Sequence, residues 1–575
     1  MSTDDPQWAS SLAASFSERV LLNHADEEIQ LERARAEQAE ARLAKLEGSA
    51  LWKTVALLRR SKRKQERAAT TSPGDLVPGI GLLPWTDVDQ RRKALANRLA
   101  AVAGQYGVEV DSDDLPAALD AIGKLFEQRK DDRQLAWVTY VAIVAKYPVN
   151  IDMLRFYTDL QVNGVQAALE QLLIANAKRP NVWVMRSKMR FETRPIIDPT
   201  TTSRRQLHTG IQRVVRSVVP EWMKLGDAEL TVWAGKGMVF RPANAVERTR
   251  ILDFQPNVRV EGDKVKDPDT ILVPWNTTVV VPEPTMEFDR TVALTALANW
   301  SGSRVSTVLH DVLAISSPEW FTDESRIKLT NYTPVLRTSS RVSAVSATSA
   351  GNLRALLPAF VDPVITAENI SSHLLPVDAV ELSSPEFEAT KAELGGIPGL
   401  PVVLAVSSID PRKNHLILLR AAEKLWQEGL GFQLLIIGWG AWHNDGFAAE
   451  LERLQAHGRP IRIIRRATEA QLWTAYHLAS FSVFVSLAEG YGLPAAESLA
   501  AGVPVVLSNY GAMAEVGEGG GTVPVDPHNL DEVAAAMRDL LTNSEHLDSL
   551  KQQATARPRQ TWQDYARATW SWLVP

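Results

Sequence analysis

Residues 481–506 read FSVFVSLAEGYGLPAAESLAAGVPVV: an apolar run, a glycine-containing loop, a helical segment and a second apolar run. The first run, Phe481–Ser486, has the length and composition of a buried strand. Gly490 and Gly492 let the loop backbone approach a ligand closely, and Pro494 suits the first turn of a helix. A helix that starts there directs free amide groups and its positive dipole end at a bound diphosphate.

Two glutamates flank this loop. Glu489 lies in the loop and Glu497 one turn into the helix, so both side chains can face the same ligand. Carboxylates accept hydrogen bonds from sugar hydroxyls. The alternative is a glycine-rich turn with two solvated glutamates. If only one of the two glutamates were present, that alternative would be favoured. The arrangement as a whole favours a ligand site.

Short apolar runs separated by helical segments extend outward from this stretch over about 400 residues. This alternation is typical of parallel sheets covered by helices on both faces. About 400 residues are too many for one doubly wound sheet. We therefore predict an α/β fold with two facing, Rossmann-like, doubly wound parallel sheets, in domains 181–385 and 386–575. Glu381–Gly399 is the predicted hinge. Ligands of such sheets bind beyond the carboxyl ends of the strands, so the two sheets would form one crevice.

These features resemble glycosyltransferase family 4, whose members have the GT-B fold and a Glu-x7-Glu motif. Glu489 and Glu497 have that spacing, and the following Ala-Gly-Val-Pro-Val-Val also matches. The resemblance extends from about Arg194 to the C-terminus. It implies that Glu489 holds donor-sugar hydroxyls and that Glu497 binds the nucleotide ribose. It also assigns contacts with the sugar and the diphosphate to the loop backbone at Gly490, Tyr491, Gly492 and Leu493.

A second site segment, Ser407–Asn414, follows the apolar run Val402–Val406. Lys413 is a compact charge suited to a diphosphate, and the planar guanidinium of Arg412 can donate two parallel hydrogen bonds to it. The segment resembles the family's Pro-Arg-Lys-Asn loop, in which the lysine neutralises the leaving diphosphate. Many members have Gly-Arg where this chain has Ser407 and Ser408, so fewer cations are expected to face the phosphates. Solvated basic residues at a helix start are the alternative.

In the first domain, the run Arg304–Leu309 leads into His310, at the expected carboxyl end of a strand. A neutral histidine there can donate a hydrogen bond to a sugar or phosphate oxygen, although a lone histidine is more often structural. Asp311 is expected to brace the loop. Gly210 lies in a Thr-Gly-Ile-Gln-Arg segment like that of some polysaccharide-building family members, and as a donor-binding residue would let the backbone approach the diphosphate, with the acceptor as the alternative. Arg213 in the same segment is either a ligand contact or a solvated side chain.

The N-terminal third lacks the alternation of strand and helix patterns seen in the rest of the chain. Residues 1–70 contain heptad-spaced Ile29, Ala36 and Leu43, followed by an amphipathic segment with six clustered cations, and residues 71–86 form a linker. The heptads predict self-association through a coiled coil, with a lone solvated helix as the alternative. The cationic segment suits an anionic membrane surface, or is a solvated linker helix. Residues 87–180 are predicted to form a helical domain.

Composition limits the remaining classes of function. The chain has 575 residues, no cysteine and a net charge of −6, so neither disulfides nor a nucleic-acid partner is expected. No apolar stretch is long enough to span a membrane and no secretory signal is recognised. We expect a cytoplasmic protein, with peripheral attachment to the inner face of the plasma membrane as a further hypothesis. Asp-x-Asp matches do not follow a convincing strand, so we expect neither a metal nor another cofactor.

The resemblance implies a retaining glycosyltransferase that moves a hexosyl group from a nucleotide-sugar to a glycan or lipid-linked glycan acceptor in surface polysaccharide biosynthesis. GDP-mannose is the first donor to consider, because the Pro-Arg-Lys-Asn loop resembles that of bacterial mannosyltransferases. Two alternatives remain open: an inactive GT-B scaffold, suggested by Ser407 and Ser408, and a GT-B sugar-nucleotide epimerase. Transfer or hydrolysis of a donor separates the enzyme from the scaffold.

Overall fold

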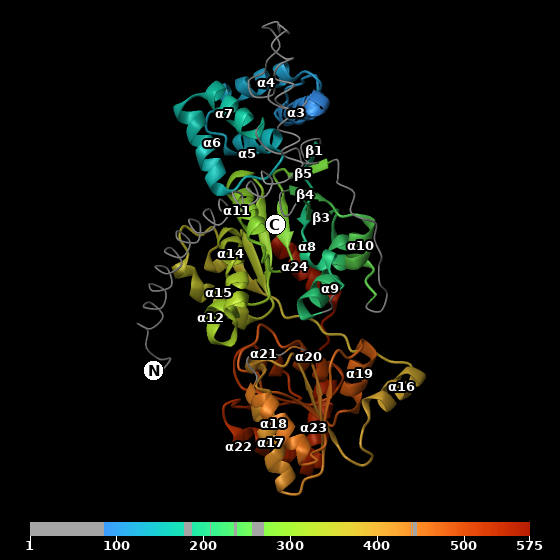
Figure 1. Cartoon of the computed structure of the whole chain (residues 1–575). Helices are drawn as coiled ribbons and strands as arrows, with labels where there is room; N and C mark the ends of the chain where they lie inside the picture. The colour runs from blue at the N-terminus through green and yellow to red at the C-terminus, as the bar shows by residue number, and fades with distance from the viewer. Residues whose placement is uncertain are drawn as a thin grey trace, which may run out of the picture.

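A computed structural model describes residues 85–177, 187–206, 209–234, 239–255, 270–438, 440 and 445–575. The described residues form three parts along one axis, a helical domain followed by two sheet-containing domains (Figure 1). Residues 1–84, which include the predicted coiled coil and the cationic segment, lie outside the described residues.

The helical domain packs on the edge of the first sheet. Asp114 and Asp132 accept hydrogen bonds from Ala117 N (3.0 Å) and Leu135 N (2.8 Å), and so cap the second and third helices. The ring of Tyr147 contacts the first sheet domain across this boundary. The predicted helical domain therefore consists of α3 (Trp85–Gln105), α4 (Leu115–Gln128), α5 (Arg133–Val144), α6 (Asn150–Val162) and α7 (Val165–Ala177).

The first sheet has nine strands in the order β1-β5-β4-β3-β2-β6-β7-β8-β9. Its pairs are parallel except those of β4, which runs antiparallel to β3 and β5, so this sheet is mixed where the sequence pattern predicted parallel strands only. The strands are β1 (Lys188–Glu192), β2 (Ile196–Ile197), β3 (Glu229–Ala234), β4 (Val239–Pro242), β5 (Thr270–Pro274), β6 (Thr278–Val281), β7 (Arg304–Leu309), β8 (Arg341–Ala344) and β9 (Ile370–Ser372).

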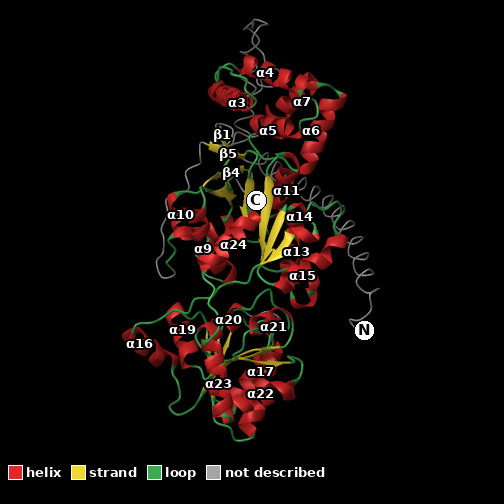
Figure 2. Cartoon of the chain, turned by 180° about the vertical axis from the view of Figure 1, so that it is seen from behind, coloured by secondary structure: helices red, strands yellow, loops and turns green. Residues whose placement is uncertain are grey.

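Helices lie on both sides of the first sheet (Figure 2). Helix α9 is strongly amphipathic and buries Val214, Val218 and Trp222 against the sheet. The helical elements of this domain are α8 (Thr200–Arg204), α9 (Gly210–Leu225), α10 (Ala245–Leu252), α11 (Phe288–Trp300), α12 (Leu313–Ser316), η3 (Pro318–Trp320), α13 (Asp323–Thr330), α14 (Thr333–Thr338), α15 (Ala347–Leu356), η4 (Leu357–Ala359) and η5 (Ala367–Asn369).

The second sheet has six strands in the order β12-β11-β10-β13-β14-β15, and all of their pairs are parallel. Chain direction across the sheet reverses between β10 and β13, so the loops after these two strands meet at a switch point. The strands are β10 (Val402–Val406), β11 (Gln433–Ile437), β12 (Ile461–Ile464), β13 (Phe481–Phe484), β14 (Val505–Ser508) and β15 (Thr522–Val525). With the first sheet, this confirms the predicted GT-B class of two facing Rossmann-like sheets.

The helical elements of the second domain cover both faces of its sheet. They are α16 (Ser384–Leu394), η6 (Pro411–Lys413), α17 (His415–Gln427), α18 (Asp445–Ala456), α19 (Glu469–Leu478), α20 (Leu493–Ala500), α21 (Gly511–Gly517), α22 (Leu530–Thr542) and α23 (Ser544–Thr555).

The hinge predicted at Glu381–Gly399 is wrong. Most of that segment forms α16, and Val377 and Val380 already pack in the apolar cluster around Trp473 of the second domain. Leu375 packs with the first domain, so the chain crosses between the domains just after it. The serine- and glycine-containing ends of the segment are instead the cap and the end of α16.

The chain also returns to the first domain at its C-terminal end. Helix α24 (Trp562–Leu573) lies beside α9 in the first domain (Figure 1). Trp222 donates to Thr569 Oγ1 (3.0 Å), and Tyr565 and Leu573 are buried in the first domain's apolar cluster. Two crossings therefore connect the domains.

Candidate active site

The residues predicted to form the site lie together around a cavity of about 350 Å³ between the two domains. The loops after β10 and β13 provide one wall, and the start of α9 with the end of β7 provides the other. Its lining includes all of the predicted site residues: Gly210, His310, Arg412, Lys413, Glu489, Gly490, Tyr491, Gly492, Leu493 and Glu497.

Glu489 pairs with both cations of the other loop. Its carboxylate accepts from Lys413 Nζ and from Arg412 Nη1 (3.0 Å), and all three side chains are largely buried. Burial by itself raises the pKa of Glu489, but the charges of Lys413 and Arg412 outweigh it and lower that pKa. Burial lowers the pKa of Lys413, against the opposing charge of Glu489. The sequence analysis assigned Lys413 to the diphosphate of the donor and Glu489 to its sugar. In the structure these two side chains contact each other.

Glu497 has two partners that its spacing from Glu489 did not reveal. Arg213 of α9 forms an ion pair with Glu497 Oε1 across the cleft. Tyr476 donates to Glu497 Oε2 (2.9 Å) and is itself fully buried. Arg213 is therefore not a solvated residue, because it joins the first domain to the carboxylate predicted to hold the ribose.

The two loop glycines serve contacts within the protein. A Cβ at Gly490 would clash with the carbonyl oxygen of His310, so glycine lets the two domains approach here. The Gly490 carbonyl accepts from Ser346 Oγ (2.5 Å) and Ser349 Oγ (3.0 Å) of the first domain. Gly492 has φ +104° and its Cβ would clash with Met513. The sequence had attributed both glycines to the close approach of a ligand.

His310 lies where predicted, but with a different hydrogen-bonding role. Its Nε2 lies 2.9 Å from the carbonyl oxygen of Pro282, which can only accept, so Nε2 carries the proton. Burial lowers the pKa of His310, which keeps the ring neutral. Nδ1 is then an acceptor, suited to a ligand hydroxyl and not to a phosphate oxygen. Asp311 Oδ1 accepts from Leu313 N (3.1 Å) and so braces the loop as predicted.

Three other predicted residues connect the walls of the cavity. Tyr491 donates to the carbonyl oxygen of Leu375 (2.6 Å), at the first crossing between the domains. A Cβ at Gly210 would lie 3.2 Å from Leu493 Cδ1, so the start of α9 packs directly on the start of α20. The backbone of this loop is thus held in place by the first domain.

The departure at Ser407 and Ser408 has a structural explanation. Ser407 Oγ lies 3.1 Å from His415 Nε2, and Ser408 Oγ donates to Asp410 Oδ2 (2.7 Å). Burial, together with the charge of Lys413, lowers the pKa of His415 to about 4, so the Ser407 partner is a neutral ring. These hydroxyls stabilise the loop that carries Arg412 and Lys413.

Sequence reasoning missed a buried charged network that includes Glu283, the neighbour of the Pro282 whose carbonyl accepts from His310. Asp198 follows β2 and accepts from Trp233 Nε1 (2.7 Å) and Arg290 Nη2 (3.3 Å). Glu283 follows β6 and accepts from Thr202 N (3.0 Å). The available signal was an acidic residue at the end of an apolar strand, Asp198 after β2 and Glu283 after β6. No local sequence pattern, however, linked Asp198 and Glu283 to each other or to Arg290.

The Glu283 carboxyl makes stability depend on pH. Burial raises its pKa to about 7, against the opposing charge of Arg290. Between pH 4.5 and 7 the folded state therefore keeps a proton that the unfolded state has lost, and stability falls as pH rises through this window, by on the order of 3 kcal/mol. We expect Glu283→Gln to flatten the decline of Tm over this range, whereas exposed Glu388→Gln leaves it unchanged. An equal slope in both variants would contradict this.

The family-model match is confined to the second domain, whereas the similarities to relatives extend over 257 and 347 residues and therefore reach beyond that domain. Residues 386–557 match the family model described as "Glycosyl transferases group 1". The chain is 26% identical over 347 residues to the serotype-specific mannosyltransferase WbdA of Escherichia coli, covering 58% of this chain and 41% of WbdA. It is 28% identical over 257 residues to O-antigen chain mannosyltransferase B of Escherichia coli, covering 44% of this chain and 64% of that protein. The chain thus spans about two fifths of the length of WbdA.

Among solved structures, the chain is similar to Anabaena Alr3699/HepE in complex with UDP and glucose, with a TM-score of 0.48 and 15% identity. That similarity covers 66% of this chain and 99% of the Anabaena chain. None of the helices in the described part of the chain combines the length and apolar content needed to cross a bilayer. Within the same residues, no group of three or more histidine, aspartate or glutamate side chains is placed to hold a metal ion.

Proposed function

We propose that this protein is a retaining glycosyltransferase that moves a hexosyl group from a nucleotide-sugar to a glycan or lipid-linked glycan acceptor in surface polysaccharide biosynthesis. The observation that carries the proposal is the cavity at the switch point, where Glu489, Lys413, Arg412 and Glu497 meet beside the start of α20. The match of residues 386–557 supports the reaction class. The mannosyltransferase names of the E. coli relatives make GDP-mannose the first donor to test.

In this proposal the donor diphosphate binds at the start of α20, where amide groups and the helix dipole favour an anion. Lys413 and Arg412 turn from Glu489 toward the phosphates and stabilise the charge of the departing diphosphate. Glu489 is then available to accept from hydroxyls of the sugar, and Glu497 from the ribose. Retention follows from front-face displacement within one ion-pair-like transition state. That route needs neither a carboxylate nucleophile nor a metal.

The inactive scaffold is a second candidate because the charged groups satisfy one another. Glu489 is paired with Lys413 and Arg412, and Glu497 with Arg213. Such pairs stabilise a closed shape without any ligand. Catalysis requires them to exchange partners, so the two candidates differ in whether a nucleotide competes for these groups.

A nucleotide screen with the full chain separates the candidates. GDP, UDP and ADP are compared by thermal shift, and the matching nucleotide-sugars are then assayed for hydrolysis and transfer. Ligand at 100 times its Kd stabilises by about 2.7 kcal/mol, a readable shift in Tm. We expect GDP to shift Tm most and GDP-mannose to be consumed. A protein that none of the three stabilises and that consumes no donor is a scaffold.

The roles of residues 1–70 remain predictions. A chain that starts at Leu76 is expected to retain donor hydrolysis but lose liposome binding and self-association, since the heptads and the six cations are removed. Binding to anionic liposomes should weaken with salt, because the Debye length falls to about 3 Å at 1 M. Pelleting of the shortened chain with these liposomes would assign membrane binding to another surface.

A further inference from the structure

Helix α15 of the first domain contacts the second domain through its N-terminus. Figure 1 shows α15 beside α21 at the junction of the two sheet domains. The carboxylate of Glu515, on α21, accepts hydrogen bonds from Ala347 N (2.7 Å), Thr348 N (2.6 Å) and Thr348 Oγ1. A carboxylate at a helix start satisfies free amide groups and interacts favourably with the positive end of the helix dipole. Here that carboxylate comes from the other domain.

The same turn of α15 contacts both walls of the candidate active site. Ser346 Oγ (2.5 Å) and Ser349 Oγ (3.0 Å) donate to the carbonyl oxygen of Gly490, in the loop that carries Glu489. Ser349 Oγ also lies 3.1 Å from the carbonyl oxygen of His310, on the opposite wall. Both serines are fully buried. The start of α15 therefore connects three pieces: the end of β7, the loop after β13, and α21.

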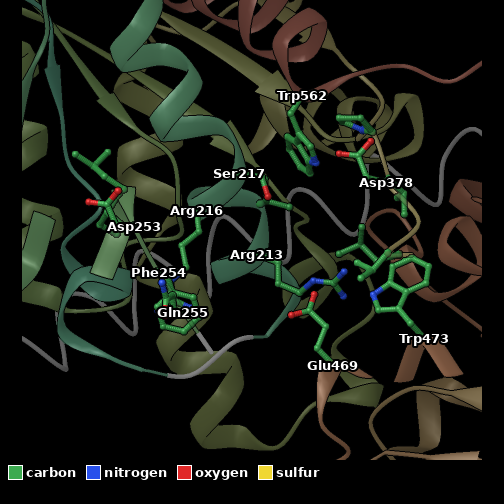
Figure 3. Close-up of a pocket in the computed structure, with 17 residues that line it drawn as sticks. Arg213, Arg216, Ser217, Asp253, Phe254, Gln255, Asp378, Glu469, Trp473 and Trp562 are labelled. Atoms are coloured by element: carbon green, nitrogen blue, oxygen red, sulfur yellow. The ribbon is translucent and has the colours of Figure 1, made fainter. Parts of the chain in front are cut away.

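The domains are packed less tightly beside α9. A cavity of about 570 Å³ separates α9 and α10 of the first domain from α19 of the second (Figure 3). Arg213 lies at the wall of this cavity, and its ion pair with Glu497 bridges the domains there. Because a cavity contributes no packing contacts, the contact between α15 and α21 carries a larger share of the domain interface.

The contact between α15 and α21 is polar and borders solvent. Ala347 is exposed, and Thr348 and Glu515 are half-buried. Water can therefore take the place of either partner when the domains separate, at a small cost in free energy. Polar contacts of this kind are typical of interfaces between domains that move relative to each other. The contact is thus suited to a reversible closure.

We propose that Glu515 is a positioning residue, which holds α15 against the second domain and so keeps His310 and Glu489 on facing walls of one cavity. The inference rests on the proposed function. Glu515 itself lies outside the lining of this cavity, so it acts through α15 and not on the donor. The groups proposed to bind the nucleotide all belong to the second domain. Loss of Glu515 should therefore slow the reaction of a bound donor without weakening nucleotide binding.

Glu515→Gln in the full chain tests this role, with Glu518→Gln, an exposed carboxylate just after α21, as the matched control. An amide has one acceptor oxygen, and its N–H groups would face the donors of α15. We expect kcat for GDP-mannose consumption to fall at least tenfold, since small misplacements of reacting groups are costly, and the Kd for GDP to stay within twofold of the parent. Thr348→Val, which removes a donor on the other side of the contact, should lower kcat in the same direction. An unchanged kcat in Glu515→Gln, or an equal loss of GDP binding, would overturn the proposal.

A distance measurement separates failure of this inference from failure of the proposed function. The chain has no cysteine, so spin labels can be placed at Lys328→Cys on α13 and Asp548→Cys on α23, both exposed. Without any donor, we expect Glu515→Gln to lengthen or broaden the distance between these labels and Glu518→Gln to leave it unchanged. Identical distances in Glu515→Gln and the parent would overturn the positioning role even if turnover fell. A longer distance in Glu515→Gln, together with a parent that consumes no donor, would instead count against the proposed function.

Discussion

Lys413→Met is expected to lower transfer from the nucleotide-sugar by about 100-fold or more, because it removes a positioned charge that stabilises the departing diphosphate. Methionine keeps most of the buried volume, and Arg412 still pairs with Glu489. Some stability will be lost, since Lys413 is itself largely buried beside Glu489. Rates are therefore measured below the Tm of the variant, with the donor at saturation.

Lys424→Met is the matched control for Lys413→Met. Lys424 lies in the last turn of α17 in the same domain and forms an exposed pair with Asp531 of α22 (2.5 Å). We expect its transfer rate to remain near that of the parent. A folded Lys413→Met protein with near-normal turnover would mean that the diphosphate binds elsewhere.

Arg213→Met is expected to lower the free energy of unfolding by about 3–5 kcal/mol, since it leaves the buried carboxylate of Glu497 without its cation. Tyr476 alone then holds that carboxylate. Because the ion pair crosses the cleft, its loss should also loosen domain closure. Tm is the measurement.

A double variant isolates the pair. Arg213→Met with Glu497→Gln removes both charges, and the stability of this protein should exceed that of Arg213→Met alone. Arg538→Met is the control, because Arg538 and Glu428 form an exposed pair whose loss costs no more than about 1 kcal/mol. Equal destabilisation by Arg213→Met and Arg538→Met would show that the interdomain pair has no special role.

Sequence patterns were sufficient for the second sheet and for the position of its site loops. The runs Val402–Val406 and Phe481–Ser486 are apolar and short, and glycine, proline and helical segments follow each of them. These signals are local, since a strand, its loop and the next helix are specified within about 20 residues of one another. Parallel strands place such loops at the same edge, so sequence alone predicted that the loops carrying Lys413 and Glu489 border one crevice.

The tertiary structure alone decided which charged groups pair and which residues connect the domains. Lys413 and Glu489 are 76 residues apart, and Arg213 and Glu497 are 284 apart. Over such separations no sequence periodicity relates the two partners. A buried carboxylate needs a cation beside it, and the packing of the folded chain determines which cation that is. For the same reason α24 returns to the first domain, since its buried face is complementary to α9 and only the folded chain brings the two helices together.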